Sequence, residues 1–266
     1  MIDEEHLLEH LQSLFGKNPE QFNIIEEQID IQLQMSYFKR SKRLKKKKVE
    51  LQDMLQKVPL LYQDDVRIEE KRDILIHLAS FEQVEAFRAI EAFWKVAEGD
   101  IKPWASMAYR ENKMMLESSL LDEKQILIST GLGGKGQKLR YFLVFVHAQN
   151  EDFTETQQKI VRNELEFVLH KQNSEVESVE FCNQLVKIFV LIPISIAIKD
   201  LIVHVVAECN QYGNFVSENF LITNVKELEN EEIFQIIQEK SIESEYDDFD
   251  EIEGFEDDED EDDDDE

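Results

Sequence analysis

Apolar residues recur at intervals of three and four through the first part of the chain, which is the spacing of amphipathic helices. The pattern predicts helices over residues 3–15, 19–57, 64–79, 80–98 and 104–120. The second of these is expected to begin at Pro19, a favoured first helical residue, and to end near Lys57, because Pro59 cannot continue a helix. This part of the chain predicts a helical bundle or a short helical array.

The pattern changes near residue 121, where β-branched and aromatic residues become frequent. Strands are predicted over residues 125–129, 139–148, 177–182, 185–192 and 215–223. Helices are predicted over residues 154–172, 195–212 and 230–240. The order gives two strand–strand–helix units and a further strand. It predicts a mainly antiparallel sheet with helices on one face, and with the other face free for a partner.

Acidic residues dominate the end of the chain. The formal net charge is −29, and the 18 acidic residues from Glu243 to Glu266 have no basic residue among them. Such a segment buries too little apolar surface to fold alone, so we expect a disordered tail. Four apolar residues recur within it at every third position and form a candidate linear motif: Tyr246, Phe249, Ile252 and Phe255.

The predicted fold class is therefore α+β, with three parts. A helical domain is expected over residues 1–120, an α+β domain over residues 121–242, and the acidic tail over residues 243–266. The net charge makes the chain as a whole repel nucleic acid, so nucleic-acid binding would need a local basic patch.

One such patch is present. Eight of the ten residues from position 39 to position 48 are basic: Lys39, Arg40, Lys42, Arg43, Lys45, Lys46, Lys47 and Lys48. On a helix this density covers every face, so we expect more than the solvated side of an amphipathic helix. The functional interpretation is phosphate contact with RNA, DNA or a ribonucleoprotein surface. The alternatives are a solvated linker, or a docking site for the chain's own acidic tail, which would then compete with nucleic acid.

Four of the chain's eight glycines lie between positions 131 and 136. Their spacing matches neither the phosphate-binding P-loop nor the dinucleotide fingerprint, and a strand follows instead of a helix. One interpretation is a flexible loop that presents N–H groups and positive charge to a phosphate or carboxylate. Its residues would be Gly131, Gly133, Gly134, Lys135, Gly136, Lys138 and Arg140. The alternative is a wide hairpin turn that needs positive φ at several positions.

The segment from Ser129 to Gly134 resembles the one that leads into the Gly-Gly-Gln motif of peptide-chain release factors, where a glycine-rich loop also joins two strands. The resemblance covers about ten residues and implies peptidyl-tRNA hydrolysis. In that family the glutamine directly follows the paired glycines. Here Lys135 occupies that position and Gln137 comes two residues later, so the catalytic residue is missing from its place.

The other chemistry-bearing residues predict no clear site. His6, Glu9 and His10 match the H-x-x-E-H spacing of a zinc peptidase motif, but no third ligand is indicated, and surface histidines on a helix are the alternative. Cys182 and Cys209 have no metal-type spacing and fit core positions in a reducing compartment. We expect no metal and no cofactor. The chain shows neither a signal peptide nor a membrane-spanning run, so we expect a soluble, cytoplasmic protein.

These patterns favour a non-enzymatic cytoplasmic interaction or adaptor protein. It would contact a nucleic-acid-containing or ribonucleoprotein assembly through the basic run, tuned by the acidic tail, and a protein partner through the tail or the free sheet face. One alternative is a hydrolase, or a phosphate- or carboxylate-binding enzyme, that uses the loop at residues 131–136. Another is a purely structural protein–protein interaction module. A cleft around Lys135 and Arg140 would favour the enzyme, and a loop standing free in solvent would favour the interaction protein.

Overall fold

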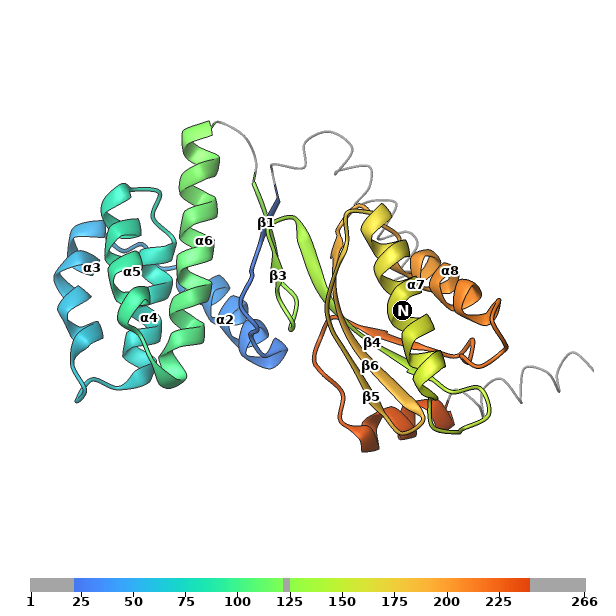
Figure 1. Cartoon of the computed structure of the whole chain (residues 1–266). Coiled ribbons are helices and arrows are strands. Elements are labelled where there is room, and N and C mark those ends of the chain that lie inside the picture. Colours follow the sequence, from blue (N-terminus) through green and yellow to red (C-terminus); the bar gives the residue numbers. More distant parts are fainter. Residues whose placement is uncertain (1–21, 122–124, 240–266) are drawn as a thin grey trace, which may run out of the picture. The chain divides into compact units, whose positions relative to one another are not determined.

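The computed structural model describes residues 22–121 and 125–239 of the 266-residue chain (Figure 1). The chain divides into two compact units, one ending at Glu227 and the other beginning at Leu228. The predicted α+β class is confirmed, because helices dominate the described residues up to 121 and a curled antiparallel sheet with its own helices follows. The helix expected over residues 3–15 and the acidic tail over residues 243–266 lie outside the described residues. The boundaries of the three expected domains stay a prediction.

The helices up to residue 121 bury their apolar sides against one another. Their bounds are α2 Ile31–Leu44, α3 Leu51–Lys57, α4 Ile68–Ala79, α5 Val84–Val96 and α6 Lys102–Leu121, with the short 3₁₀ helices η2 Val58–Tyr62 and η3 Gly99–Ile101. The division expected near residues 79–80 falls between α4 and α5. Pro59 and Pro103 lie in the first turns of η2 and α6, where a missing N–H breaks no helical hydrogen bond.

The single long helix predicted from Pro19 to Lys57 is wrong. The described part of that range begins with a strand, β1 Phe22–Ile24, and then holds α2 and α3 separated by residues 45–50. Asp30 starts α2, because its side chain accepts a hydrogen bond from the Leu33 N–H at 3.0 Å. Within the described part of this range, the helical spacing of apolar residues therefore corresponds to a helix only from the start of α2 onward.

Strand β1 pairs in parallel with β2 Ile126–Ile128, so that Phe22 lies opposite Ile126. The pairing continues past β1, where the Ile25 N–H donates to Ile128 O at 2.9 Å. Ile25 and Ile29 are both buried, which explains why their spacing imitates a helix. A local pattern identifies buried positions, but here a partner about 100 residues away determines the backbone conformation.

The main sheet has the strand order β3-β4-β6-β5, and β7 also pairs with β4. Its strands are β3 Gly134–Lys135, β4 Lys138–Val146, β5 Glu175–Cys182, β6 Leu185–Pro193 and β7 Leu221–Thr223. All the pairs are antiparallel, and β4 pairs with β6 along its whole length. This confirms the two predicted strand–strand–helix units, except that the strand expected at 125–129 is β2, which pairs outside this sheet.

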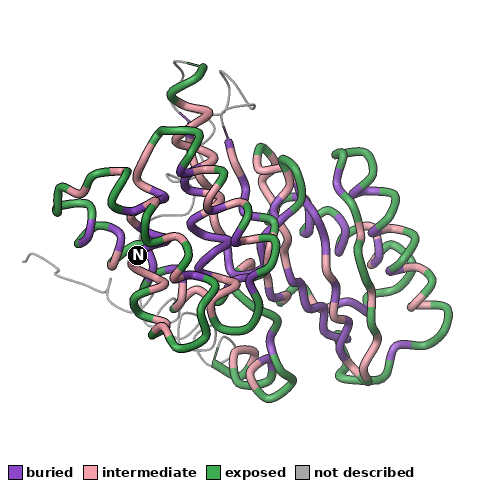
Figure 2. Tube along the Cα trace, turned by 90° about the vertical axis from the view of Figure 1, so that its left-hand side faces the viewer, coloured by how far each residue is buried: buried purple, intermediate pink, exposed green. Residues whose placement is uncertain are grey.

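Helices α7 Glu155–Lys171 and α8 Ile198–Asn210 cover one face of the sheet (Figure 1). Thr154 begins α7 with a capping box, in which its side chain and that of Gln157 each accept a hydrogen bond from the other residue's backbone N–H. Leu143 and Phe145 of β4 pack with both helices in one hydrophobic cluster, and a second cluster joins α2 to α6. Figure 2 shows the buried residues in purple along the strands and the exposed residues in green on the outer turns of the helices. In the second unit, residues 230–239 are helical.

The opposite face of the main sheet is not free at its centre. Phe142, Val144 and Leu191 alternate with residues that face α7 and α8, and they therefore point to the other side. All three are nevertheless fully buried. The expectation of a free sheet face is therefore wrong at these positions.

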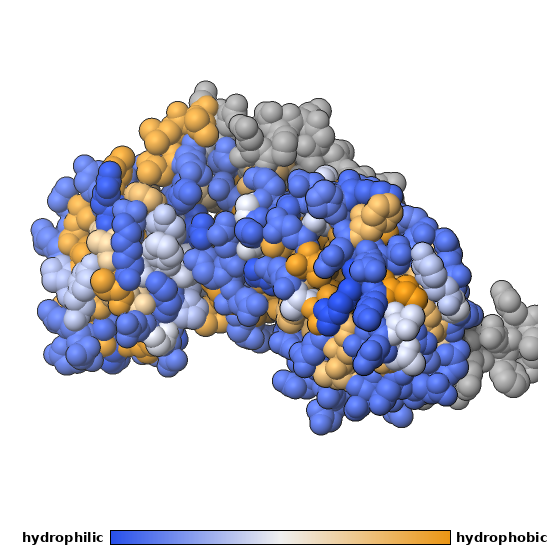
Figure 3. Space-filling view, viewed as in Figure 1, coloured by the Kyte–Doolittle hydropathy of each residue, from blue (hydrophilic) through white to orange (hydrophobic). Residues whose placement is uncertain are grey.

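The visible surface is largely hydrophilic (Figure 3). An apolar exception lies at the C-terminal end of α6, where Leu120 and Leu121 are 71% and 61% exposed. Within the described parts of the chain, no helix combines the length and the apolar character needed to cross a membrane.

Candidate nucleic-acid interface

Helix α2 carries the first part of the basic run and has two distinct sides. Its buried side consists of Gln34, Tyr37, Ser41 and Leu44, which follow one another at helical spacing. Tyr37 is fully buried, and its ring lies 5.4 Å from that of Trp104 in α6. This packing determines which residues of the run face solvent.

Four basic residues share the exposed side and form what we call the basic stripe: Lys39, Lys42, Arg43 and Lys46. Their spacing of three, four and seven places the first three on one side of α2, and Lys46 follows just after its end. Within residues 22–121 and 125–239, none of the four forms an ion pair. The stripe is therefore available for an external anion.

Two other residues of the run are bound internally. Arg40 Nε lies 2.5 Å from Asp73 Oδ1 in α4, and this hydrogen bond raises the pKa of Arg40. Lys45 Nζ lies 2.7 Å from Glu111 Oε1 in α6. Arg40 and Lys45 therefore join the basic run to the neighbouring helices, and their first role is structural.

The expectation that basic residues cover every face of a helix is wrong. Ser41 and Leu44 are the only residues that interrupt the run, and they occupy the buried positions. A dense basic run is thus compatible with an ordinary amphipathic helix. Helix α2 also ends at Leu44, so the lysines from Lys45 to Lys48 lie in the connection to α3.

Apolar side chains flank the basic stripe, and the sequence analysis missed them. Met35 and Phe38 are 60% and 40% exposed, and Lys42 lies one helical turn from Phe38. An exposed aromatic ring beside cations is a surface on which a nucleic-acid base can stack. The sequence evidence for an exposed ring beside the basic run was weak, because Phe38 precedes the run and because its neighbour Tyr37 faces the core.

Glu111 connects the core to the basic run. This carboxylate is only 7% exposed, and it accepts hydrogen bonds from the Tyr37 hydroxyl at 2.6 Å and from Lys45 at 2.7 Å. Burial raises the pKa of Tyr37 well above its ordinary value, and Glu111 raises it further, so the hydroxyl stays protonated and acts as a donor.

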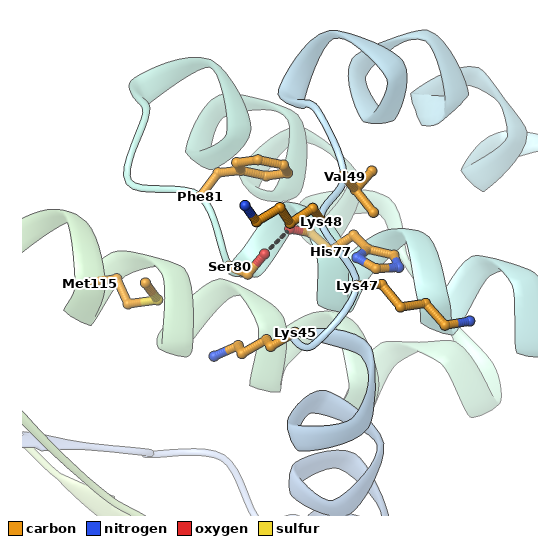
Figure 4. Close-up of a pocket in the computed structure, with 8 residues that line it drawn as sticks. All are labelled: Lys45, Lys47, Lys48, Val49, His77, Ser80, Phe81 and Met115. Carbon is orange, nitrogen blue, oxygen red and sulfur yellow. Dashed lines mark hydrogen bonds between the residues drawn. The ribbon is translucent and has the colours of Figure 1, made fainter.

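A pocket of about 250 Å³ lies beside the end of α2 (Figure 4). Its lining includes Lys45, Lys47, Lys48, His77, Ser80 and Phe81. Figure 4 shows the ammonium groups of Lys45 and Lys48 on the same side as Ser80, with that of Lys47 pointing away. The last three lining residues come from the end of α4 and the turn after it. The sequence does not indicate that these three residues lie beside the basic run, because only helix packing brings them there.

The first half of the glycine-rich loop is packed against other backbone segments. Gly131, Gly133 and Gly134 are buried, and a Cβ atom at these positions would overlap the carbonyl oxygens of Val225, Glu26 and Lys138, respectively. Gly133 and Gly136 also have positive φ, of 70° and 59°. The glycines thus allow close backbone approach and two left-handed conformations, which supports the turn interpretation.

The positive side chains of this loop have partners on β5. Lys135 and Lys138 both bind Glu175, at 3.1 and 2.7 Å, and Arg140 binds Glu177 through two nitrogens, at 2.5 and 2.9 Å. The bond from Lys138, followed by that from Lys135, lowers the pKa of Glu175. Only the tip at residues 135–137 is exposed. The loop is neither a cleft nor a free arm, and ligand binding by its residues stays a prediction.

His147 and Cys209 lie in buried, structural environments. His147 is buried, and its Nδ1 accepts hydrogen bonds from the backbone N–H groups of Gln149 and Glu151. Burial raises the pKa of Cys209 to about 12. In the part of the chain that the structure describes, no group of three or more His, Cys, Asp and Glu side chains is arranged to hold a metal ion. The H-x-x-E-H motif at residues 6–10 lies outside that part.

Comparison with known proteins gives no family. No protein-family model matches the chain, and no curated protein matches it at a significant level. A solved structure from Deinococcus radiodurans R1, provisionally assigned as a transposase, is similar over 40% of this chain and 95% of its own, with 15% identity and a TM-score of 0.34. A likeness of that size carries no argument about this chain. The fold and surface of the present chain define an α+β protein, with a basic stripe along α2 and a lysine-lined pocket beside that helix.

Proposed function

We propose that this protein is a non-enzymatic adaptor that contacts a nucleic-acid-containing or ribonucleoprotein assembly through the basic stripe. The observation that carries the proposal is that Lys39, Lys42 and Arg43 lie together on the exposed side of α2, with Lys46 just after its end, and that none of the four forms an ion pair among the described residues. In a chain with a net charge of −29, such a cluster of unpaired positive charge is best explained by contact with an external, negatively charged partner.

The basic stripe is not explained by a contribution to the stability of the fold. Like charges one helical turn apart cost a few tenths of a kcal/mol per pair. The buried side of α2 and the bonds of Arg40 and Lys45 already attach the helix to its neighbours. Phosphate groups would remove the repulsion, and Phe38 would offer a stacking surface at the same place.

The acidic tail belongs to the same proposal. Its 18 acidic residues between Glu243 and Glu266 would compete with nucleic acid for the basic stripe at low ionic strength. Removing residues 243–266 should therefore strengthen nucleic-acid binding at low salt and change it little at high salt. Equal affinity of the full and shortened chains at low salt would remove the tail from the proposal.

A cytoplasmic location is also proposed. Cys182 and Cys209 are both free, which fits a reducing compartment.

The decisive experiment measures binding of a fluorescently labelled single-stranded RNA by anisotropy over a range of salt concentrations. We expect the combined variant Lys39→Gln, Lys42→Gln, Arg43→Gln and Lys46→Gln to bind at least about tenfold more weakly at low salt, with a log–log salt slope shallower by up to about 3. The matched control removes four exposed lysines elsewhere: Lys57, Lys159, Lys171 and Lys199.

The control separates a specific interface from the effect of net charge. Both variants lower the net charge by the same amount, so a loss confined to the stripe variant supports the interface. An equal loss in both variants, or no loss in the stripe variant, contradicts it.

A further inference from the structure

The pocket beside α2 differs from the basic stripe because it is a hollow, open to solvent on one side, and not a helix face. Among its described lining residues there are three lysines and no acidic residue, although the chain has 58 acidic and 29 basic residues. A concave site of one charge sign concentrates ions of the opposite sign more strongly than a flat surface does. The pocket therefore favours an anion.

Lys48 is the lysine best placed to hold this anion. The charge of Lys45 is partly balanced by Glu111, which itself lies outside the lining and also accepts from Tyr37. Lys48 is exposed and forms no ion pair with any described residue, and Figure 4 shows its ammonium group on the side of Ser80 and Phe81.

The C-terminal end of α4, which borders the pocket, does not cancel this positive charge. Helix ends of this kind expose carbonyl oxygens that repel anions. Here the Ser80 hydroxyl donates to His77 O at 2.7 Å. The side-chain amide of Asn112 donates to three further carbonyl oxygens, those of Leu78, Ala79 and Phe81. These acceptors are therefore engaged inside the protein.

We infer that this pocket binds the phosphomonoester group of a nucleotide, with the phosphate between Lys45 and Lys48 and the base against Phe81. The Ser80 hydroxyl would keep its hydrogen bond to His77 O, so the two lysines hold the phosphate. The inference deepens the proposed function, on which it rests for the identity of the partner as nucleic acid. The base and sugar would lie toward the aromatic side of the pocket.

Size and charge select the ligand class. A volume of about 250 Å³ lies below the range of about 300–1,000 Å³ that is common for drug-sized ligands, so there is room for one nucleotide at most. A phosphomonoester carries close to two negative charges at neutral pH and can enter a pocket from one side. An internal phosphodiester carries one negative charge, and the strand continues from both sides of it, so the pocket would need two openings. The pocket therefore fits a free nucleotide or the phosphorylated end of a strand.

Calorimetric titration of the full chain tests the site with four probes: AMP, adenosine, inorganic phosphate and O-phosphoserine. We expect AMP to bind most tightly and adenosine not to bind. Lys48→Gln should weaken AMP binding at least tenfold, whereas Lys159→Gln, at an exposed lysine outside both the lining and the basic stripe, should change it less than twofold. O-phosphoserine binding as tightly as AMP would overturn the nucleotide assignment.

Absence of AMP binding to the unmodified chain would overturn the site, and equal losses in the Lys48 and Lys159 variants would do the same. If Lys48→Gln lowers the melting temperature and AMP does not bind, the lysines only stabilise helix ends. Phe81→Leu gives a second, independent variant, for which we expect AMP binding to weaken and phosphate binding to stay unchanged.

Two oligonucleotides of one sequence, with a 5′-phosphate and with a 5′-hydroxyl, distinguish this inference from the proposed function. The basic stripe variant should weaken both to the same degree, whereas Lys48→Gln should abolish only the preference for the 5′-phosphate. If neither oligonucleotide binds but AMP does, the proposed function fails and the nucleotide pocket stands. If both bind equally and AMP does not bind, the proposed function stands and the pocket is overturned.

Discussion

The Tyr37 hydroxyl donates a hydrogen bond of 2.6 Å to Glu111 and joins α2 to α6 across 74 residues of sequence. Tyr37 is fully buried and Glu111 nearly so. Lys45 binds the other oxygen of the same carboxylate at 2.7 Å. One buried acid therefore holds the helix of the basic stripe in place and also positions a lysine of the adjoining pocket.

Tyr37→Phe should destabilise the fold by about 1–3 kcal/mol, because it leaves one oxygen of a buried carboxylate without its donor. Urea unfolding followed by circular dichroism measures the change. Tyr62→Phe is the control, since Tyr62 is 50% exposed and its change should stay within about 0.5 kcal/mol. Equal effects of the two substitutions would contradict a structural role for the Tyr37–Glu111 bond.

Gly133→Ala should destabilise the fold by more than Gly136→Ala. Both residues have positive φ, so each substitution strains the backbone by about 1–2 kcal/mol. Only at Gly133 does the added Cβ also overlap backbone atoms, those of Glu26 and Glu27, whereas nothing lies within 4 Å at Gly136. Thermal unfolding of the two variants measures the difference. A Gly133→Ala protein as stable as the Gly136→Ala protein would show that the loop is not packed against residues 26–27.

His77 should titrate below its ordinary pKa. Burial is the main cause, with Lys57 and Lys47 adding to it and Asp73 opposing it. The unfolded chain then binds the proton first as the pH falls. The stability that comes from neutral His77 is therefore fully present above about pH 6.5 and is lost as the pH falls through the lower pKa of the folded state.

Proton NMR of the His77 ring measures this pKa directly. Lys47→Gln should raise the pKa of His77 by removing a nearby positive charge. A pKa at or above 6.5 in the unmodified chain would contradict the burial of the ring. In His77→Gln, the free energy of unfolding should fall less between pH 7.5 and pH 5.5 than in the unmodified chain.

Cys209 should resist alkylation in the folded protein. Burial, followed by Glu164 and Glu208, raises its pKa to about 12, so only about one thiol in ten thousand is ionised at pH 8. Burial, followed by the bond to Glu180, also raises the pKa of Cys182, but that residue is partly exposed. Iodoacetamide labelling followed by mass spectrometry should find Cys182 modified first, and Cys209 modified only in denaturant. Equal labelling rates in the native protein would refute this.

Local patterns were sufficient for the three long strands of the main sheet, β4, β5 and β6, and for the helices α7 and α8. The apolar run of β4, the short turn between β5 and β6, and the capping signal at Thr154 all lie within a few residues of the structure that they specify. The break between α4 and α5 was predictable for the same reason. These elements confirm the α+β class expected from the sequence.

Long-range packing decided the rest. Phe22 to Ile24 form a strand because β2 lies beside them, although the spacing of apolar residues around them is helical. The basic run predicted positive charge, but the positions of Asp73 and Glu111 decide which residues of the run are engaged internally and which remain in the basic stripe. The sequence by itself determined which side chains are charged or apolar. Only the tertiary structure decided which of them meet, because ion pairs, parallel strands and pocket walls join residues that are far apart in the chain.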